Sequence, residues 1–275
     1  RDYFYAGFND YCLRTYEHIE GEEKQEADEY IYQIFMINNI KNELIMSLKN
    51  TKNEKLYLLY LYYKYYYLNE KENILNELKN INVLSSNGTI LKSRILFDNN
   101  LLDECLDILE NGSIEISAAQ ILFLLSIDRE DLVKDKINIF LKMNDETPIV
   151  KIILAIFYLY TDNYKESFLL FEDLESLYTS VVNDVSTIII NGKGVSNMLS
   201  YEFNDAKDLL KNGLNDCKTK NGDIIYNLIT TSLYLYELDD ANDYLNKLYK
   251  TYPRHDSLDV LEMIDYEVEN FVPDF

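Results

Sequence analysis

Small residues recur at long intervals in the second half of the chain, each a few positions after a polar turn. The three clearest are Ser167, Ala206 and Ala241, which lie 39 and 35 positions apart (206 − 167 and 241 − 206). In each case a bulky apolar residue stands three positions earlier. In helical repeat proteins a small side chain stands at a fixed place, where the two helices of a repeat cross. The pattern therefore predicts a chain built from stacked helix-turn-helix units.

The same spacing continues toward the N-terminus, although the interval varies. Val133 precedes Ser167 by 34 residues, and Cys105 precedes Val133 by 28 (167 − 133 and 133 − 105). A period near 34 residues is typical of the tetratricopeptide repeat. We therefore predict an all-α fold, a right-handed α-solenoid of tetratricopeptide-like helix-turn-helix repeats. We expect a single solenoid over residues 1–275, with its most regular repeats at about 90–253.

Glycine and proline are scarce, which favours long helices joined by short turns. The 275 residues include 8 Gly and 3 Pro, and 47% are hydrophobic, which is enough for a sizeable core. Pro253 falls where a second helix should stop, because proline removes a backbone donor and clashes with the preceding turn. After it, a final helix over about 257–270 is expected to cap the end of the solenoid.

A run rich in Leu and Tyr extends from Tyr57 to Leu68 and is broken by Lys64. Two interpretations are open. The run is either an exposed patch that binds a partner, or a helix buried on more than one face whose Tyr hydroxyls reach water. Tyr is common throughout the chain, at 25 residues, which favours the buried helix.

The chain is strongly acidic. It has 48 Asp and Glu against 26 Lys and Arg, a formal net charge of −22. A nucleic-acid surface needs clustered basic side chains to neutralise phosphates, and no basic stripe is present. Direct docking to an anionic membrane is disfavoured for the same reason. We therefore expect no nucleic-acid partner and no direct membrane contact.

The cysteines indicate a reducing compartment. Cys12, Cys105 and Cys217 are widely spaced and give no disulfide framework or Cys-x-x-Cys pair. Cys12 and Cys105 fall at predicted helix crossings, where a free Cys packs as a small hydrophobe. Arg1 is followed by a polar, acidic stretch rather than by a secretory signal, and native residues before Arg1 are left open. The longest apolar runs are about a dozen residues, too short to span a membrane. We expect a cytoplasmic protein.

No constellation of residues indicates an enzyme. The chain has two histidines, His18 and His255, far apart and without a Cys/His cluster for zinc. His255 follows Pro253 and is expected to be a solvated turn residue. The segment Asn191–Gly194 lacks the lead-in and the terminal Lys-Ser/Thr of a phosphate loop, so Gly194 is assigned to helix packing. We expect no catalytic, cofactor-binding or metal-binding residues. An enzyme with an unrecognised site on a helical scaffold is the alternative, and it predicts clustered titratable residues in a pocket.

The first helix of each tetratricopeptide repeat lines the concave face, and our register assigns candidate partner-binding residues to this groove. They are Leu122, Leu125, Ile149, Ile152, Ile156, Leu159, Ile188, Asn191, Val195, Met198, Tyr226 and Leu233. Because an apolar surface left open to water promotes aggregation, we expect a partner segment or the chain's own winding to fill it. Asn191 alone fits a clamp for a peptide carboxylate. The alternative is that the register is shifted and these residues pack between helices.

Several short motifs follow one another in a fixed order along the chain. The mid-chain motif, residues 127–137, reads Ile-Asp-Arg-Glu-Asp-Leu-Val-Lys-Asp-Lys-Ile. The others are Phe4–Gly7, Phe171–Leu174, Ile189–Gly192, Asp223–Ile229, Tyr249–His255 and Asp265–Phe271. This ordered set resembles the epsilon subunit family of coatomer, whose mid-chain motif is similar to Leu-Asp-Arg-x-Asp-Leu-Ala-Arg-Lys-x-Leu. Two positions depart from it: Val133 replaces the family's Ala, and Tyr201 begins the turn where the family has Gly-Arg-Trp or Gly-Arg-Tyr.

The resemblance implies a non-enzymatic structural subunit of the COPI vesicle coat. It implies binding and stabilisation of the C-terminal domain of the alpha coatomer subunit, in retrograde Golgi-to-ER and intra-Golgi transport. Other coatomer subunits would be indirect partners. The protein would be cytoplasmic and peripheral on Golgi membranes and COPI-coated vesicles, reaching the membrane only through the assembled coat. The alternative is a generic tetratricopeptide-repeat adaptor or co-chaperone that binds peptide segments, which predicts a basic groove.

Overall fold

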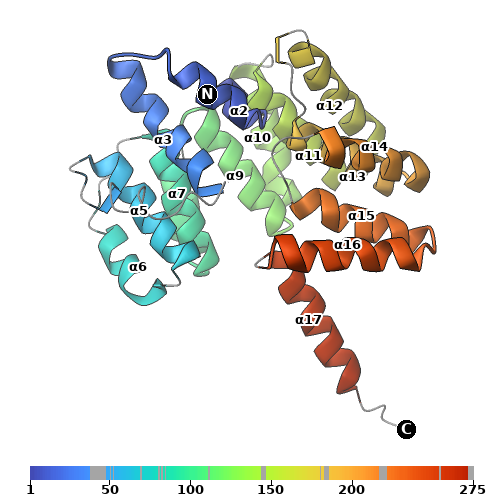
Figure 1. Ribbon diagram of the computed structural model, residues 1–275. Helices are drawn as coiled ribbons and strands as arrows, with labels where there is room; N and C mark the ends of the chain where they lie inside the picture. Colours follow the sequence, from blue (N-terminus) through green and yellow to red (C-terminus); the bar gives the residue numbers. More distant parts are fainter. Residues whose placement is uncertain are drawn as a thin grey trace. The chain divides into compact units, whose positions relative to one another are not determined.

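The computed structural model describes most of the chain. The described residues are 1–37, 48, 49, 51, 53–68, 70–79, 81, 83, 85–110, 112–143, 147–179, 181, 182, 186–216, 222–253 and 255–271. Cys217 lies outside them. All secondary-structure elements of this described part are helices, which confirms the all-α prediction (Figure 1). The chain forms two compact units, Arg1–Tyr160 and Thr161–Phe275. A single solenoid over residues 1–275 stays a prediction.

Each unit consists of short helices that pair with their sequence neighbours (Figure 1). In the first unit they are α1 (Asp2–Tyr5), α2 (Asn9–Tyr16), α3 (Glu22–Ile37), α5 (Glu54–Tyr67), α6 (Lys71–Lys79), α7 (Ser86–Asp98), α8 (Leu102–Ile108), α9 (Ile114–Ser126), α10 (Glu130–Met143) and α11 (Pro148–Tyr160). In the second they are α12 (Tyr164–Thr179), α13 (Thr187–Leu199), α14 (Phe203–Asp216), α15 (Gly222–Tyr234), α16 (Leu238–Thr251) and α17 (Asp256–Glu269). The last helix begins and ends within one residue of the prediction.

The residues at the predicted helix crossings are all buried. None of them has more than 8% of its surface exposed. They are Cys12, Cys105, Val133, Ser167, Ala206 and Ala241. Gly194 shows how tight such a crossing is, because a Cβ built on it would lie 2.6 Å from Cδ2 of Leu210 in the next helix. The predicted packing role of Gly194 is therefore confirmed.

A residue with positive φ precedes each of these crossing residues by five positions. The set is Gly7 (82°), Asn100 (58°), Asp128 (55°), Asp162 (60°), Tyr201 (64°) and Tyr236 (60°). In the last turn the Glu237 N–H donates to the Ser232 carbonyl at 2.9 Å, the six-residue closure of a Schellman motif. Gly7 is the one glycine in the set, so composition did not reveal that the turns share this backbone geometry.

Helix α5 settles the two interpretations of the Leu- and Tyr-rich run. Leu58, Leu59 and Leu61 are at most 2% exposed, and Tyr63 and Tyr65 are also buried. The Tyr hydroxyls at the margins bond to carboxylates, as in the 3.0 Å bond that the Tyr57 hydroxyl donates to Glu77. The run is therefore a helix buried on several faces.

No helix in the described part of the chain combines the length and apolar character needed to cross a lipid bilayer.

Candidate partner-binding surfaces

In the first unit, two of the residues predicted to line an open face are buried instead. Leu125 is 1% exposed and Ile149 is 9% exposed, and both belong to one core cluster with Phe140 and Val150. The reason is that α9, which carries Leu125, is contacted by α7, α10 and α11, and α11, which carries Ile149, is contacted by α1, α9 and α10. The sequence interpretation is corrected for Leu125 and Ile149, because a side chain covered by its own unit has no area to offer a partner.

The other four predicted residues of this unit keep some accessible surface. Leu122 is 39% exposed, and Ile152, Ile156 and Leu159 are half-buried. Ile156 also packs against the core cluster, so a charged residue there would disturb the fold as well as the surface. Leu122 is the most accessible of the four.

In the second unit, all six predicted residues retain accessible surface. Ile188 of α13 is 37% exposed and Leu233 of α15 is 50% exposed, whereas Val195, Met198 and Tyr226 are half-buried. These two first helices contact one another directly. Ile188 and Leu233 are therefore the most exposed apolar residues of the predicted face in this unit.

Asn191, the one predicted polar residue, is also half-buried. Its Oδ1 accepts a 2.7 Å hydrogen bond from Nδ2 of Asn227, which joins α13 to α15. This bond joins the two first helices through the amide oxygen, whereas a carboxylate clamp would use the Nδ2 donors. The argument against such a clamp is that the other predicted positions of the face carry no Lys or Arg.

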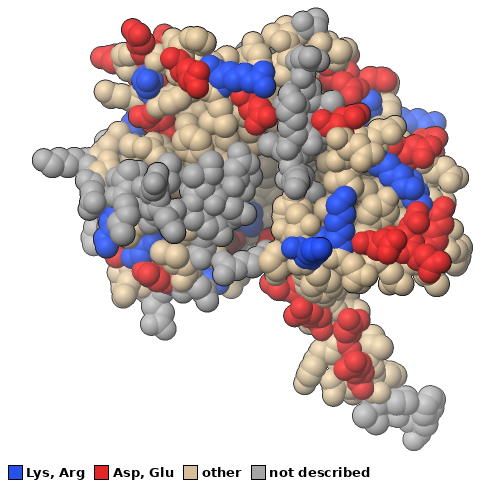
Figure 2. Space-filling model, in the orientation of Figure 1, with Lys and Arg blue, Asp and Glu red and all other residues tan. Residues whose placement is uncertain are grey.

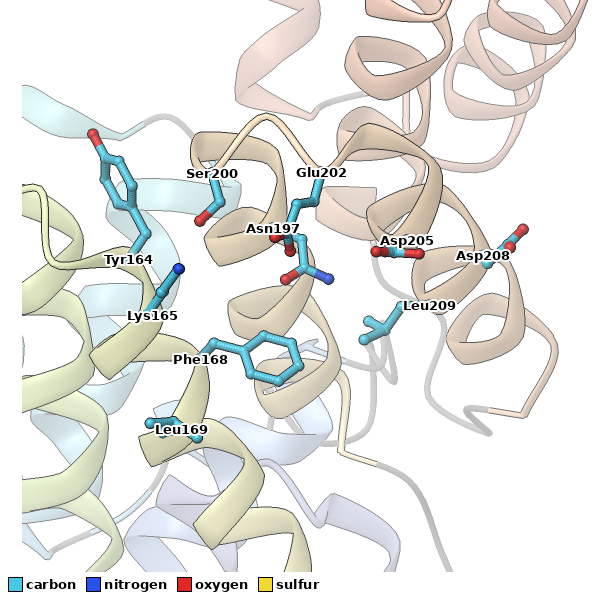
Figure 3. Close-up of a pocket in the computed structure, with 10 residues that line it drawn as sticks. All are labelled: Tyr164, Lys165, Phe168, Leu169, Asn197, Ser200, Glu202, Asp205, Asp208 and Leu209. Carbon is cyan, nitrogen blue, oxygen red and sulfur yellow. The ribbon is translucent and has the colours of Figure 1, made fainter.

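A pocket of about 560 Å³ lies between α12, α13 and α14, and the sequence did not predict it. Phe168 of α12 and Leu209 of α14 stand on opposite sides, with Asn197 of α13 between them (Figure 3). Glu202, Asp205 and Asp208 border it together with one basic residue, Lys165, and none of the three carboxylates pairs with a described Lys or Arg side chain. An apolar floor with an acidic rim suits an apolar group that carries a cation. We refer to it as the acidic-rimmed pocket.

The final helix α17 is attached to the second unit mainly at its beginning. Leu258 is 2% exposed and packs with Ile225 and Leu248, and Leu261 lies partly buried beside them. From Glu262 to Phe271, every side chain is exposed. The predicted cap is therefore limited to the first turns of α17, because the rest of the helix extends away from α15 and α16 (Figure 1).

His255 caps the beginning of α17 and connects it to Asp223 of α15. Its Nδ1 accepts from the Ser257 N–H at 3.4 Å as the N-cap of α17, and its Nε2 lies 3.1 Å from Oδ1 of Asp223. The His255 side chain is 18% exposed, so the expectation of a solvated turn residue was wrong. No local pattern indicated this contact, because Asp223 is 32 residues away along the chain.

One buried lysine of the second unit is held by two carboxylates. Lys207 of α14, buried to 8% exposure, pairs with Glu237 and lies 2.6 Å from Oδ2 of Asp240 in α16. The hydrogen bond from the Lys207 ammonium lowers the pKa of Asp240.

Burial raises the pKa of the Cys12 and Cys105 thiols to about 11, which leaves them protonated and unreactive at neutral pH. The described residues contain no group of three or more His, Cys, Asp or Glu placed to bind a metal ion.

Comparison with known proteins identifies the family. The amino-acid sequence matches the model of the coatomer epsilon subunit family over residues 1–275. It is 24% identical over 146 residues to coatomer subunit epsilon-1 of Arabidopsis thaliana, covering 52% of this chain and 47% of that protein. It is 28% identical over 146 residues to coatomer subunit epsilon-2 of Oryza sativa subsp. indica, covering 52% and 46%. The chain spans about half the length of the curated relatives it matches.

Solved structures with a similar fold are tetratricopeptide-type proteins of low sequence identity. A tetratricopeptide repeat protein from Parabacteroides merdae superposes with a TM-score of 0.62 at 11% identity, covering 94% of this chain and 97% of that one. NprR in complex with its peptide NprX gives a TM-score of 0.55 at 17% identity, covering 98% and 86%. At such identities the likeness concerns the fold alone. Since the family model covers residues 1–275 and the helix pairs have the repeat architecture found in these structures, the chain belongs to the coatomer epsilon subunit family.

Proposed function

We propose that this chain is a non-enzymatic structural subunit of the COPI vesicle coat. In this proposal it binds and stabilises the C-terminal domain of the alpha coatomer subunit. The other coatomer subunits are indirect partners, which it reaches through the alpha subunit. It acts in retrograde Golgi-to-ER and intra-Golgi transport, in the cytoplasm and peripherally on Golgi membranes and coated vesicles. The observation that carries the proposal is the match to the family model along the whole chain.

The first helices of the second unit provide the surface for this partner. Ile188 and Leu233 are large apolar side chains that are exposed to water. A partner that covers them gains binding free energy, because apolar surface is removed from water. Val195, Met198 and Tyr226 lie half-buried on the same two helices. Basic side chains that would hold a peptide carboxylate are missing from the predicted positions. This favours one apolar, long-lived partner over the alternative of a co-chaperone for peptide tails.

The binding of two purified proteins tests the proposal. The full chain and the C-terminal domain of the alpha subunit are expected to form a stable complex in gel filtration and calorimetry. The double variant Ile188→Glu/Leu233→Glu should weaken binding at least about tenfold, because two apolar contacts of more than about 1 kcal/mol each are lost. Leu177→Glu is the matched control, since Leu177 is also 50% exposed but lies on a second helix, α12.

Two results would count against the proposal. Absence of a complex between the wild-type chain and this domain of the alpha subunit would reject the coat assignment. A complex that forms with wild-type affinity in the double variant would leave the coat assignment standing and reject the first-helix surface. Purification from native cytosol adds a check in the cell extract, where the chain should elute with a large coat complex that retains the alpha subunit.

A further inference from the structure

The exposed part of α17 carries an apolar stripe along one side. Val260, Ile264 and Val268 are separated by four residues each, the spacing that keeps side chains on one helix face. At about 100° per residue, the three fall within an arc of about 80°. Their exposed fractions are 48%, 48% and 70%, and Phe271, just beyond the end of the helix, is 74% exposed. Leu258, which anchors the helix, lies outside this arc, and Leu261, which packs beside it, lies about 20° beyond the edge of the arc. The three residues of the stripe itself are exposed.

The remaining surface of α17 is rich in acidic side chains. Asp256, Asp259, Glu262, Asp265, Glu267 and Glu269 lie on the helix, which contains no Lys or Arg. Figure 2 shows acidic side chains along α17 and no basic side chain on the visible face. Several of these carboxylates are three or four residues apart, an arrangement that destabilises an isolated helix. A partner with basic side chains would remove this repulsion.

These charges decide which occupant suits the stripe. A second copy of the chain would place acidic helices side by side, and the whole chain carries a net charge of −22. The acidic-rimmed pocket of another copy repels α17 for the same reason, because Glu202, Asp205 and Asp208 border it. An anionic membrane attracts helices with Lys and Arg on the polar face, the reverse of what α17 carries. What remains is a protein groove with an apolar floor and basic edges.

We propose that α17 docks as an amphipathic helix into an apolar groove of the alpha coatomer subunit that is bordered by Lys and Arg side chains. Val260, Ile264 and Val268 occupy the floor of the groove, and the carboxylates of Asp265 and Glu267, which flank the stripe on its two sides, face its basic edges. This is the helix-in-groove mode of recognition, read as apolar anchors at helical spacing. The inference rests on the proposed function and adds a second contact, separate from the first helices α13 and α15.

The contacts of His255 support the docking of α17 as a helix. The N-cap bond from the Ser257 N–H and the contact with Asp223 set the direction in which α17 leaves the unit. A helix of 14 residues is marginal on its own in water, so a fixed first turn favours the helical form before a partner arrives. The anchored start therefore presents the stripe in a form ready to bind.

The test compares full-length variants for binding to the purified C-terminal domain of the alpha subunit. Ile264→Asp/Val268→Asp should weaken binding at least about tenfold, because it places charge in an apolar groove. Asp265→Lys/Glu267→Lys should weaken binding and flatten its dependence on salt, since complementary charges speed association at low salt. Met263→Asp is the matched control, because Met263 is 59% exposed on α17 and lies outside the stripe. Thermal unfolding of each variant should match wild type, because the changed side chains are exposed.

Each outcome distinguishes the inference from the function on which it rests. If wild type binds the domain of the alpha subunit and the stripe variant binds equally well, the role of α17 is rejected and the coat function stands. If wild type does not bind, both are rejected. If wild type floats with vesicles containing phosphatidylserine, or dimerises, and the stripe variant does not, the occupant is a membrane or a second copy and the inference is overturned.

Discussion

Replacing Tyr236 with glycine should stabilise the protein. Tyr236 has φ of 60°, the left-handed region, which costs a residue with a Cβ roughly 1–2 kcal/mol relative to glycine. Its side chain is 90% exposed, so truncation removes almost no buried area. Glycine makes the unfolded chain more flexible, which offsets about 0.5–1 kcal/mol of the gain. The net gain is therefore about 0.5–1 kcal/mol, or about 1–4 °C in Tm for a chain of this size.

Thermal and urea unfolding of a substitution series measure this effect. Tyr236→Ala keeps the Cβ and should melt close to wild type, and Tyr236→Asn should lie between Ala and Gly because Asn tolerates left-handed backbone. Gly7→Ala supplies the reverse change at the equivalent turn, where φ is 82°, and should destabilise by the same net amount, about 0.5–1 kcal/mol. If the glycine and alanine variants of Tyr236 unfold at the same temperature, the backbone argument is refuted.

Three further perturbations follow from the packing and charges. Lys207→Met should lower Tm at neutral pH, and the difference in Tm between the variant and wild type should shrink below about pH 4. The reason is that the pKa of Asp240 is lower in the folded protein, so its ion pair with Lys207 stabilises the fold above the unfolded pKa and is lost as the carboxyl is protonated. Gly194→Ala should destabilise by about 1–3 kcal/mol in thermal unfolding, because its Cβ would overlap the facing leucine; an unchanged Tm would show that the helices separate easily. Cys12 and Cys105, with thiol pKa values of about 11, should resist a thiol reagent at pH 8 until urea unfolds the chain; rapid labelling of the folded protein, in a background where the third cysteine is serine, would contradict their burial.

The candidate surfaces were only partly predictable from the sequence. Ile188 and Leu233 are open, as the repeat register predicts. Leu125 and Ile149 are covered, since a register assigns a residue to a face but does not say which neighbouring helices cover that face. The alternative that such residues pack between helices therefore holds for these two. The acidic-rimmed pocket was not predicted, because its residues come from three separate helices and form no motif along the chain.

The sequence alone determined that this protein is built from helix pairs and where each pair crosses. Helix crossing needs a small side chain at one position, and that requirement is written locally, in residues such as Ser167, Ala206 and Ala241. Tertiary structure decided which apolar faces remain open, because exposure depends on contacts between residues far apart in the chain. The expected capping helix shows the difference. Its boundaries are readable from Pro253 onward, whereas its open apolar stripe depends on the way α17 packs, through Leu258 and Leu261 near its beginning.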